Sequence, residues 1–273
     1  SANTPFLCVL GFKTPHSPRN MPPTRTATHY ADKTAADVPN LSHRTDYAPN
    51  ANQGSDASDL RGYMRNVTAI DDNVGEILNL LETLKIANNT AVIFISDQGY
   101  FRGEHGLGDK RAPYEESIRI PFMIRYPAAQ TSASVIDEIA LNLDLAPTIL
   151  DIVGLDIPDN MQGRSLLPFI SGQSPSNWRD SFIFSYSHDP EFPSATIRPY
   201  VAIRHQDGTK LVNYAENSSW NELFLTDVTN PHDADSDPYE VSNLYSSAEH
   251  YSTRNAMEKL LRERTKQQGF LKL

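Results

Sequence analysis

Apolar and polar positions along this chain follow the spacings of both helices and strands. Apolar side chains recur every three or four residues over residues 60–84, as on one face of a long helix. A β-branched apolar run at 90–95 follows and predicts a buried strand. Another strand is predicted over 118–126, and a short apolar helix over 143–153 that ends at Gly154. This alternation of helix and strand is typical of an α/β domain.

The N-terminal region combines an apolar run with a long polar stretch. Residues 6–12 are continuously apolar and predict a buried strand, in which the single cysteine, Cys8, would be a small buried side chain. A stretch rich in Pro, Thr and Asn follows from residue 14 to about residue 55. A loop of this length within a compact domain is usually either functional or disordered.

The last hundred residues have a different pattern. A composition shift at 171–176, Ser-Gly-Gln-Ser-Pro-Ser, predicts a linker between a main domain at 1–172 and a small α+β subdomain at 173–273. Beyond the linker, alternating strands are predicted at 182–186, 200–205 and 210–214, with a hairpin turn at 207–208 and a terminal polar helix at 248–267. We therefore expect a small antiparallel sheet followed by a helix.

Composition excludes some classes of partner. The net charge of −10 argues against nucleic acid and against an anionic membrane surface, because no basic patch offsets it. No apolar run approaches the length of a membrane span. One cysteine leaves no intrachain disulfide and does not indicate a redox compartment. A small anionic substrate is still compatible with the charge, since local cations can reverse the field inside a cleft.

The densest polar cluster lies at residues 96–110, directly after the strand predicted at 90–95. Ligands of open α/β sheets bind outside the carboxyl ends of strands. Asp97 and Gln98 offer the oxygen atoms that a hard divalent cation prefers, and four glycines let the backbone approach a ligand closely. The cluster indicates a metal or anion site. The alternative is a surface loop in which Asp97 caps the next turn.

Five short motifs in and after this cluster resemble the central signature of the type I sulfatases, members of the alkaline phosphatase superfamily. They are Ser96-Asp97-Gln98-Gly99, Gly103-Glu104-His105-Gly106, Lys110, Tyr114-Glu115-Glu116-Ser117 and Arg119-Ile120-Pro121. Residues 12–18, 144–150, 161–167, 221–225 and 237–244 also resemble segments of that family, so the likeness covers essentially the whole chain. The resemblance implies a doubly wound mixed sheet flanked by helices, as an incomplete alkaline-phosphatase-like domain, followed by the small antiparallel subdomain.

The resemblance also implies roles for four residues. Asp97 is a carboxylate ligand of a calcium-type cation, with magnesium and manganese as alternatives. Gln98 stands at the next ligand position, where relatives more often have Asn or His, so the coordination geometry here differs. Lys110 contacts the sulfate oxygens. His16 hydrogen-bonds the sulfate and protonates the leaving alcohol.

Each of these residues also has a simpler interpretation. His16 is alternatively a loop residue held between two prolines, and Lys110 a solvated lysine. His105 fits the family pattern as a residue that shapes the loop and not as a catalytic group. Glu115 and Glu116 are expected to begin a packed helix and to pair with Arg119.

Two elements of the family are not found in this sequence. Type I sulfatases form their formylglycine nucleophile from the first residue of C/S-x-P-S-R, and Cys8 is followed by Val9, so it does not begin that motif. The acidic pair that completes the metal site is also missing. In the family both precede the segment where this chain begins. We therefore expect the remainder of a longer enzyme, inactive alone, whose partner is the N-terminal part of the same protein.

The expected function is that of a sulfuric ester hydrolase, an arylsulfatase-like enzyme acting on a sulfate ester or sulfated glycan in the periplasm or outside the cell. One alternative is a phosphodiesterase or phosphonate monoester hydrolase of the same superfamily, because phosphate and sulfate esters share tetrahedral geometry. Another is a non-catalytic pseudo-sulfatase that binds sulfated glycans through His16 and Lys110.

Overall fold

The structure is a computed structural model that describes residues 4–19, 22–34, 40, 57–130, 132–187, 197–226, 236–267 and 269. The chain forms two compact units. One comprises Ser1–Val38 and Ser55–Ala87, and the other Pro39–Gly54 and Asn88–Leu273. Among the described residues, every helix is too short or too polar to cross a bilayer. Much of the long polar stretch predicted at 14–55 lies outside the described residues.

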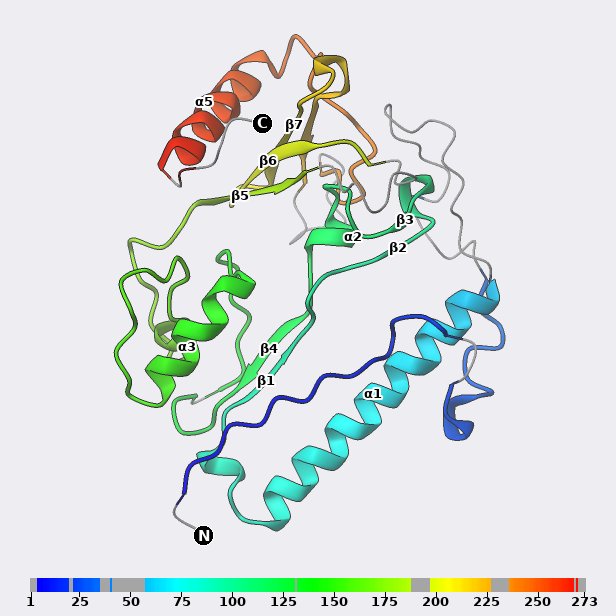
Figure 1. Ribbon diagram of the computed structural model, residues 1–273, viewed down its shortest axis with the longest axis vertical. Coiled ribbons are helices and arrows are strands. Elements are labelled where there is room, and N and C mark those ends of the chain that lie inside the picture. The colour runs from blue at the N-terminus through cyan, green and yellow to red at the C-terminus, as the bar shows by residue number, and fades with distance from the viewer. Residues whose placement is uncertain are drawn as a thin grey trace. The chain divides into compact units, whose positions relative to one another are not determined.

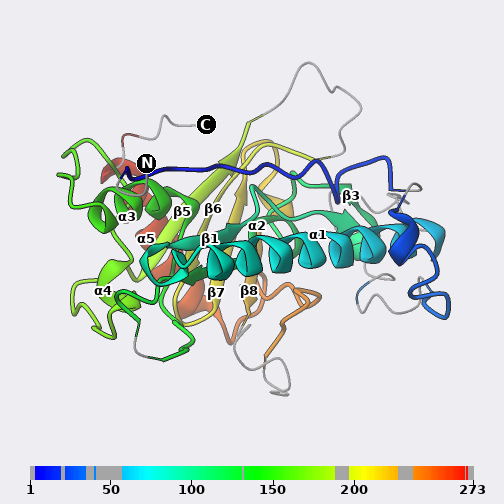
Figure 2. The ribbon, with the colours of Figure 1, turned by 90° about the horizontal axis from the view of Figure 1, so that it is seen from below.

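The first unit contains the long helix that the sequence predicts. Helix α1 (Ala57–Thr83) is continuous (Figure 2), and the 3-10 turn η1 (Thr24–Thr26) packs on it. Arg19 donates to both carboxylate oxygens of Asp59 at 3.2 and 3.1 Å. A Cβ at Gly62 would lie 2.3 Å from the carbonyl oxygen of Arg19, so only glycine permits this close approach.

The strand predicted at residues 6–12 is wrong. The described segment has no regular secondary structure, and its apolar side chains are exposed, Phe6 at 63% and Val9 at 87%. Cys8 is exposed as well, contrary to the expectation of a buried side chain. A strand is stable only where a neighbour pairs with its backbone. No strand among the described residues pairs with this segment.

The second unit begins with two paired strands. Strand β1 (Val92–Ile95) runs antiparallel to β4 (Phe122–Arg125), as Figure 1 shows, and both lie where strands were predicted. The predicted apolar helix is α3 (Leu145–Ile152), preceded by the 3-10 turn η5 (Asn142–Asp144) and followed by α4 (Leu167–Ile170).

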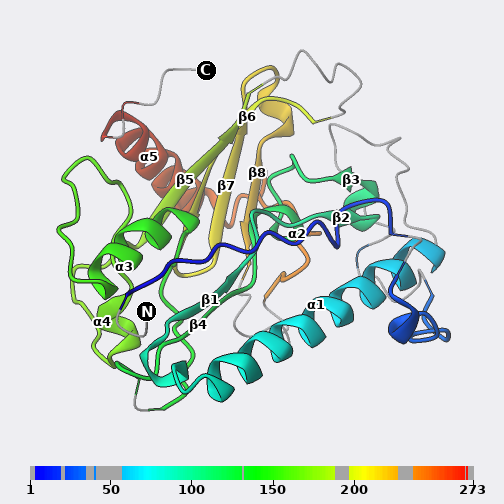
Figure 3. The ribbon, with the colours of Figure 1, turned by 60° about the horizontal axis from the view of Figure 1, so that its bottom comes forward.

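Strands β5 (Ser181–Tyr186), β6 (Tyr200–His205), β7 (Thr209–Tyr214) and β8 (Glu222–Leu225) form an antiparallel sheet in chain order (Figure 3). Helix α5 (Tyr251–Gln267) packs against it. Met257 and Leu261 of the helix bury against Ile203, Leu211 and Leu223 of the sheet. The predicted antiparallel strands, hairpin and terminal helix are confirmed, whereas β8 was recognised only as a family-like segment.

Residues on both sides of the predicted boundary at 172 lie in the same compact unit, and the boundary stays a prediction. One hydrophobic cluster joins the polar loop after β1 to the antiparallel sheet. Its buried members are Phe101, Leu107, Ala112, Tyr114, Ile197, Tyr200, Ala202, Val212, Tyr214 and Phe224. The sheet is therefore the packing support for the loop that carries the candidate chemistry.

Candidate active site

The loop after β1 is fastened to helix α2 (Glu115–Ile118) at Gly99. The Gly99 N–H donates to the carbonyl of Ser117 at 2.8 Å. A Cβ at this position would lie 2.0 Å from the carbonyl oxygen of Glu116, so any other residue would push the loop away. The Ser96 hydroxyl donates to the carbonyl of Gln98 at 2.9 Å. These contacts fix the backbone on both sides of Asp97 and Gln98.

The next part of the loop contains two strained residues. It folds as β2 (Phe101–Arg102), the turn η4 (Glu104–Gly106) and β3 (Gly108–Asp109). His105 and Asp109 have φ of 53° and 75°, in the left-handed region that favours glycine. Such residues cost on the order of 1 kcal/mol and persist where packing holds them, often beside functional sites. Here His105 is fully buried and stacks on Tyr114 with ring centroids 3.9 Å apart.

An open cavity of about 440 Å³ lies between this loop and the antiparallel sheet. Its lining comprises Gln98, Lys110, Arg111, Ser117 and Ile118 from the loop and α2, and Phe184, Ser185, Tyr186 and Tyr200 from β5 and β6. The structure thus brings together Gln98 and Lys110, two of the four predicted site residues. Asp97 adjoins Gln98 in the chain, and its side chain is exposed.

The fourth predicted residue, His16, belongs to the first compact unit. Its imidazole is exposed, and Nδ1 lies 3.0 Å from the carbonyl of Ser17 and 3.1 Å from the Nζ of Lys13. The roles of His16, Lys110, Asp97 and Gln98 stay predictions.

A buried charge network underlies the loop. The ammonium of Lys210 is fully buried, forms an ion pair with Glu240 and donates to the carbonyl of Pro113 at 2.7 Å. Glu240 accepts from the backbone N–H of Glu115 at 2.8 Å, and the Glu115 carboxylate lies 3.5 Å from Arg204. The segment that follows Lys110 is therefore tied to β6, β7 and the turn at residue 240.

The expected pairing of the two glutamates with Arg119 is wrong for Glu115, whose side-chain partners are Arg204 and Lys210 of the sheet.

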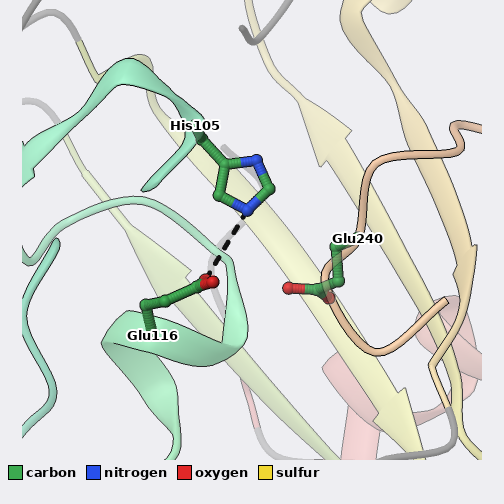
Figure 4. A group of neighbouring side chains, drawn as sticks. All are labelled: His105, Glu116 and Glu240. Carbon is green, nitrogen blue, oxygen red and sulfur yellow. Dashed lines mark ion pairs between the residues drawn. The ribbon is translucent and has the colours of Figure 1, made fainter. Parts of the chain in front are cut away.

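Two further side chains, His105 and Glu116, approach Glu240 beside this network (Figure 4). The ligand atoms of His105, Glu116 and Glu240 lie within 4.8 Å of one another, a spacing that a metal ion could bridge. However, Lys210 already forms an ion pair with Glu240. The amide of Asn40 lies 3.1 Å from the His105 Nε2 and donates to Glu116 at 2.8 Å. Because Lys210 pairs with Glu240 and the Asn40 amide donates to Glu116, we interpret the cluster as a structural junction between the loop, α2 and the turn at residue 240. His105 is thus a loop-shaping residue, as the sequence indicated, and Glu116 pairs with it and not with Arg119.

The two glutamates of this junction have opposite pKa shifts. Burial raises the pKa of Glu240 to about 8, against the attraction of Lys210, and the charge of Glu115 adds to the rise. For Glu116, burial acts to raise the pKa, but the contacts with His105 and the hydrogen bond from Asn40 outweigh it and hold the pKa below its usual value.

The raised pKa of Glu240 predicts that stability falls as pH rises from about 4.5 to about 8. In this window the folded chain keeps a proton that the unfolded chain has lost, so the free energy of unfolding decreases with pH. The slope for one proton is at most about 1.4 kcal/mol per pH unit. Urea unfolding of the chain between pH 5 and pH 8 measures it. Glu240→Gln, which has no proton to release, should flatten the slope. An equal slope in both proteins would contradict the assignment.

Sequence reasoning missed Lys210 and Glu240. A signal for Lys210 existed, because the period of two along a strand places it on the same face as Val212 and Tyr214, both in the buried core. An inward lysine requires a buried anion. Nothing local identified Glu240 as that anion, because the two residues are distant in sequence.

An α/β unit with a polar loop at the carboxyl end of β1 and an antiparallel sheet beside it fits an alkaline-phosphatase-like fold. The Sulfatase family model matches residues 1–155, and the model for N-sulphoglucosamine sulphohydrolase, C-terminal, matches residues 103–267. The chain belongs to the sulfatase family. Family and fold class are thus as the sequence predicted.

Individual relatives agree with this assignment. The N-acetylglucosamine-6-O-sulfatase of Bacteroides thetaiotaomicron is 37% identical over 76% of this chain and 36% of its own length. A protein whose structure was solved in complex with its substrate, D-glucosamine-2-N,6-O-disulfate, is 35% identical to this chain. The two structures have a TM-score of 0.68 over 77% of this chain and 41% of that one. The phosphonate monoester hydrolase of Silicibacter pomeroyi is 25% identical, with a TM-score of 0.65 over 77% and 41%. The chain spans less than half the length of each.

Proposed function

We propose that this chain supplies part of the active site of a sulfuric ester hydrolase that acts on sulfated carbohydrates. The observation that carries the proposal is the cavity that Gln98 and Lys110 line together, next in sequence to the exposed carboxylate of Asp97. A lysine and two oxygen donors at the end of a strand suit an anionic ester and a divalent cation. The names of the relatives support a sulfated amino sugar as the substrate class.

Within this function Lys110 binds the sulfate oxygens, and His16 binds the sulfate and protonates the leaving oxygen. Asp97 and Gln98 fit a hard cation by their chemistry, as an exposed carboxylate and a half-buried amide on a loop fixed at Gly99. They would hold calcium, with magnesium or manganese as alternatives. When bound, the cation stabilises negative charge on the ester oxygens. Because calcium takes six to eight oxygen ligands, further ligands come from outside this pair.

The sequence contains no C/S-x-P-S-R motif, so the formylglycine nucleophile is proposed to lie upstream in a longer protein. This chain alone then has no turnover. Extracellular sulfatases among the relatives support a location in the periplasm or outside the cell.

The phosphonate monoester hydrolase likeness supports one second candidate, hydrolysis of phosphonate monoesters or phosphate diesters. The deciding experiment compares hydrolysis of 4-nitrophenyl sulfate, glucosamine 6-sulfate and bis(4-nitrophenyl) phosphate by this chain and by the longer protein that contains it. We expect the longer protein to cleave both sulfates faster than the diester, and this chain to cleave none. Faster cleavage of the diester would establish the second candidate. Binding of the sugar sulfate without any cleavage would make the protein a pseudo-sulfatase.

A further inference from the structure

The backbone just before Lys110 has a conformation that residues with side chains rarely adopt. Asp109 ends β3, where it pairs with Phe101 of β2, and its φ of 75° lies in the left-handed region. Asp and Asn tolerate this region better than most residues, but they keep it only where neighbouring groups hold them there. The turn at Asp109 sets the direction from which the chain presents Lys110 to the cavity.

An ion pair spans this turn. Nη1 of Arg111 pairs with the carboxylate of Asp109, two residues earlier, so the contact bridges Lys110. The side chain of Arg111 is only 21% exposed. Because Asp109 already pairs with its charge, Arg111 is poorly placed to bind an anion, although it lines the cavity. Lys110 forms no ion pair with any described residue, so its ammonium is the cation that a substrate anion can meet.

Two buried hydroxyl groups hold the carbonyls of Lys110 and Arg111. Tyr200 of β6 donates to the carbonyl of Arg111 at 3.0 Å, and Ser117 of α2 donates to that of Lys110. Tyr200 is 4% exposed and Ser117 is 6% exposed, so water competes little with either bond. The Tyr200 ring belongs to the buried cluster that joins the loop to the sheet. The ion pair, the sheet and α2 therefore all fix the backbone at Lys110.

A lysine that acts on a reacting group depends on such support. Its charge is concentrated on one atom at the end of a flexible four-carbon stem. A cation stabilises developing negative charge fully only when it already lies where that charge appears. A displacement of about 1 Å can lower the rate by 10²-fold. Fixing the backbone fixes the direction of the Cα–Cβ bond of Lys110, which removes one source of displacement.

We propose that the ion pair of Asp109 with Arg111 and the hydroxyl of Tyr200 are positioning groups that direct the Lys110 ammonium into the cavity. Arg111 acts through Lys110 and does not contact the substrate. The inference rests on the proposed function, in which Lys110 binds the sulfate oxygens, and it adds three residues that the proposed function leaves without a role. The antiparallel sheet thus contributes to the reaction through the placement of a loop residue.

Steady-state kinetics of the longer protein with 4-nitrophenyl sulfate test the ion pair. Asp109→Asn removes the carboxylate and keeps a residue that tolerates the left-handed region. We expect kcat to fall by roughly 10- to 100-fold and KM to stay within threefold, because a displaced ammonium mainly weakens transition-state stabilisation. Direct binding of the substrate by Arg111 predicts the opposite result, since Asp109→Asn would release the guanidinium and maintain or raise kcat.

A double-mutant cycle separates positioning from a general structural effect. In the Lys110→Met background, Asp109→Asn should change kcat/KM by less than threefold, because no ammonium remains to be placed. Arg111→Lys keeps a cation beside Asp109 and should retain kcat within fivefold of the original protein. Arg111→Met should lower kcat at least as far as Asp109→Asn does.

Two further variants test the hydroxyl and supply a control. Tyr200→Phe keeps the buried ring and removes the hydroxyl, so the protein should fold and kcat should fall at least threefold. Arg264→Gln breaks the ion pair of α5 with Asp180, whose members are 33% and 45% exposed, and should change kcat by less than twofold. Urea unfolding shows whether each variant is folded.

The outcomes distinguish this inference from the proposed function. A fall in kcat of less than tenfold in Asp109→Asn would overturn the inference, as would an equal fall with and without Lys110, while hydrolysis by the unchanged protein upholds the proposed function. If Asp109→Asn does not fold, Tyr200→Phe decides, and full activity in that variant overturns the inference. A longer protein that cleaves no sulfate ester would overturn the proposed function and the inference with it.

Discussion

Replacing Lys110 by methionine is expected to lower kcat/KM for sulfate ester hydrolysis by about a thousandfold in the longer enzyme proposed above. The side chain lines the cavity beside Gln98, where its ammonium would meet the oxygens on which charge develops. Removing one preorganised charge or donor from such a site typically costs 10²- to 10³-fold, or about 3–4 kcal/mol of transition-state stabilisation. Methionine keeps most of the length of the side chain, so the loss would report the charge.

The measurement uses initial rates with 4-nitrophenyl sulfate, and two further variants serve as controls. Lys259→Met removes a lysine of α5 whose side chain is 74% exposed, and it should change kcat/KM by less than twofold. Lys110→Arg retains the positive charge with a different shape, so it should recover part of the loss. A decrease of less than tenfold in Lys110→Met would make Lys110 a solvated loop residue and remove it from the proposed site.

Replacing Lys210 by methionine is expected to lower the free energy of unfolding by about 3–5 kcal/mol, the usual cost of removing one partner from a buried ion pair. Lys210 is fully buried, and its loss leaves Glu240 without its cation and Glu115 with Arg204 as its remaining basic partner. The carbonyl of Pro113 also loses its donor. Urea unfolding at pH 9, above the pKa of about 8 at which Glu240 ionises in the folded chain, measures the change.

A second replacement separates charge from packing. Lys210→Met combined with Glu240→Gln should recover at least half of the lost stability, because the uncompensated carboxylate is gone. The exposed control Lys259→Met should cost less than about 0.5 kcal/mol, since surface ion pairs contribute little. A loss below about 1 kcal/mol in the single Lys210 variant would mean that the network does not stabilise the junction between loop and sheet.

Elements with strong local signals were predictable from the sequence. The apolar spacing of α1, the β-branched run of β1 and the Asp207-Gly208 turn between β6 and β7 each depend on neighbours within a few residues. The proximity of Gln98 and Lys110 was predictable too, because both stand on one glycine-rich loop after a strand. The family motifs then provided the chemistry, which spacing alone left open between a metal site and a surface loop.

Elements that depend on distant partners were not predictable. The apolar run at residues 6–12 has the composition of a strand, but a strand also needs a pairing neighbour, and none among the described residues provides one. Glu115 and Glu116 could pair with any nearby cation, and the fold brings Arg204 and Lys210 to the first and His105 to the second.

The sequence by itself determined the family, the order of its main elements and the loop that carries Asp97, Gln98 and Lys110. The tertiary structure decided what holds that loop and what faces it. The ion pair joins Lys210 to Glu240, and the cavity is lined by both Lys110 and Tyr186. Each brings together segments that are far apart along the chain. Such contacts form only when the buried surfaces of the loop and the sheet pack together, so no local pattern could specify them.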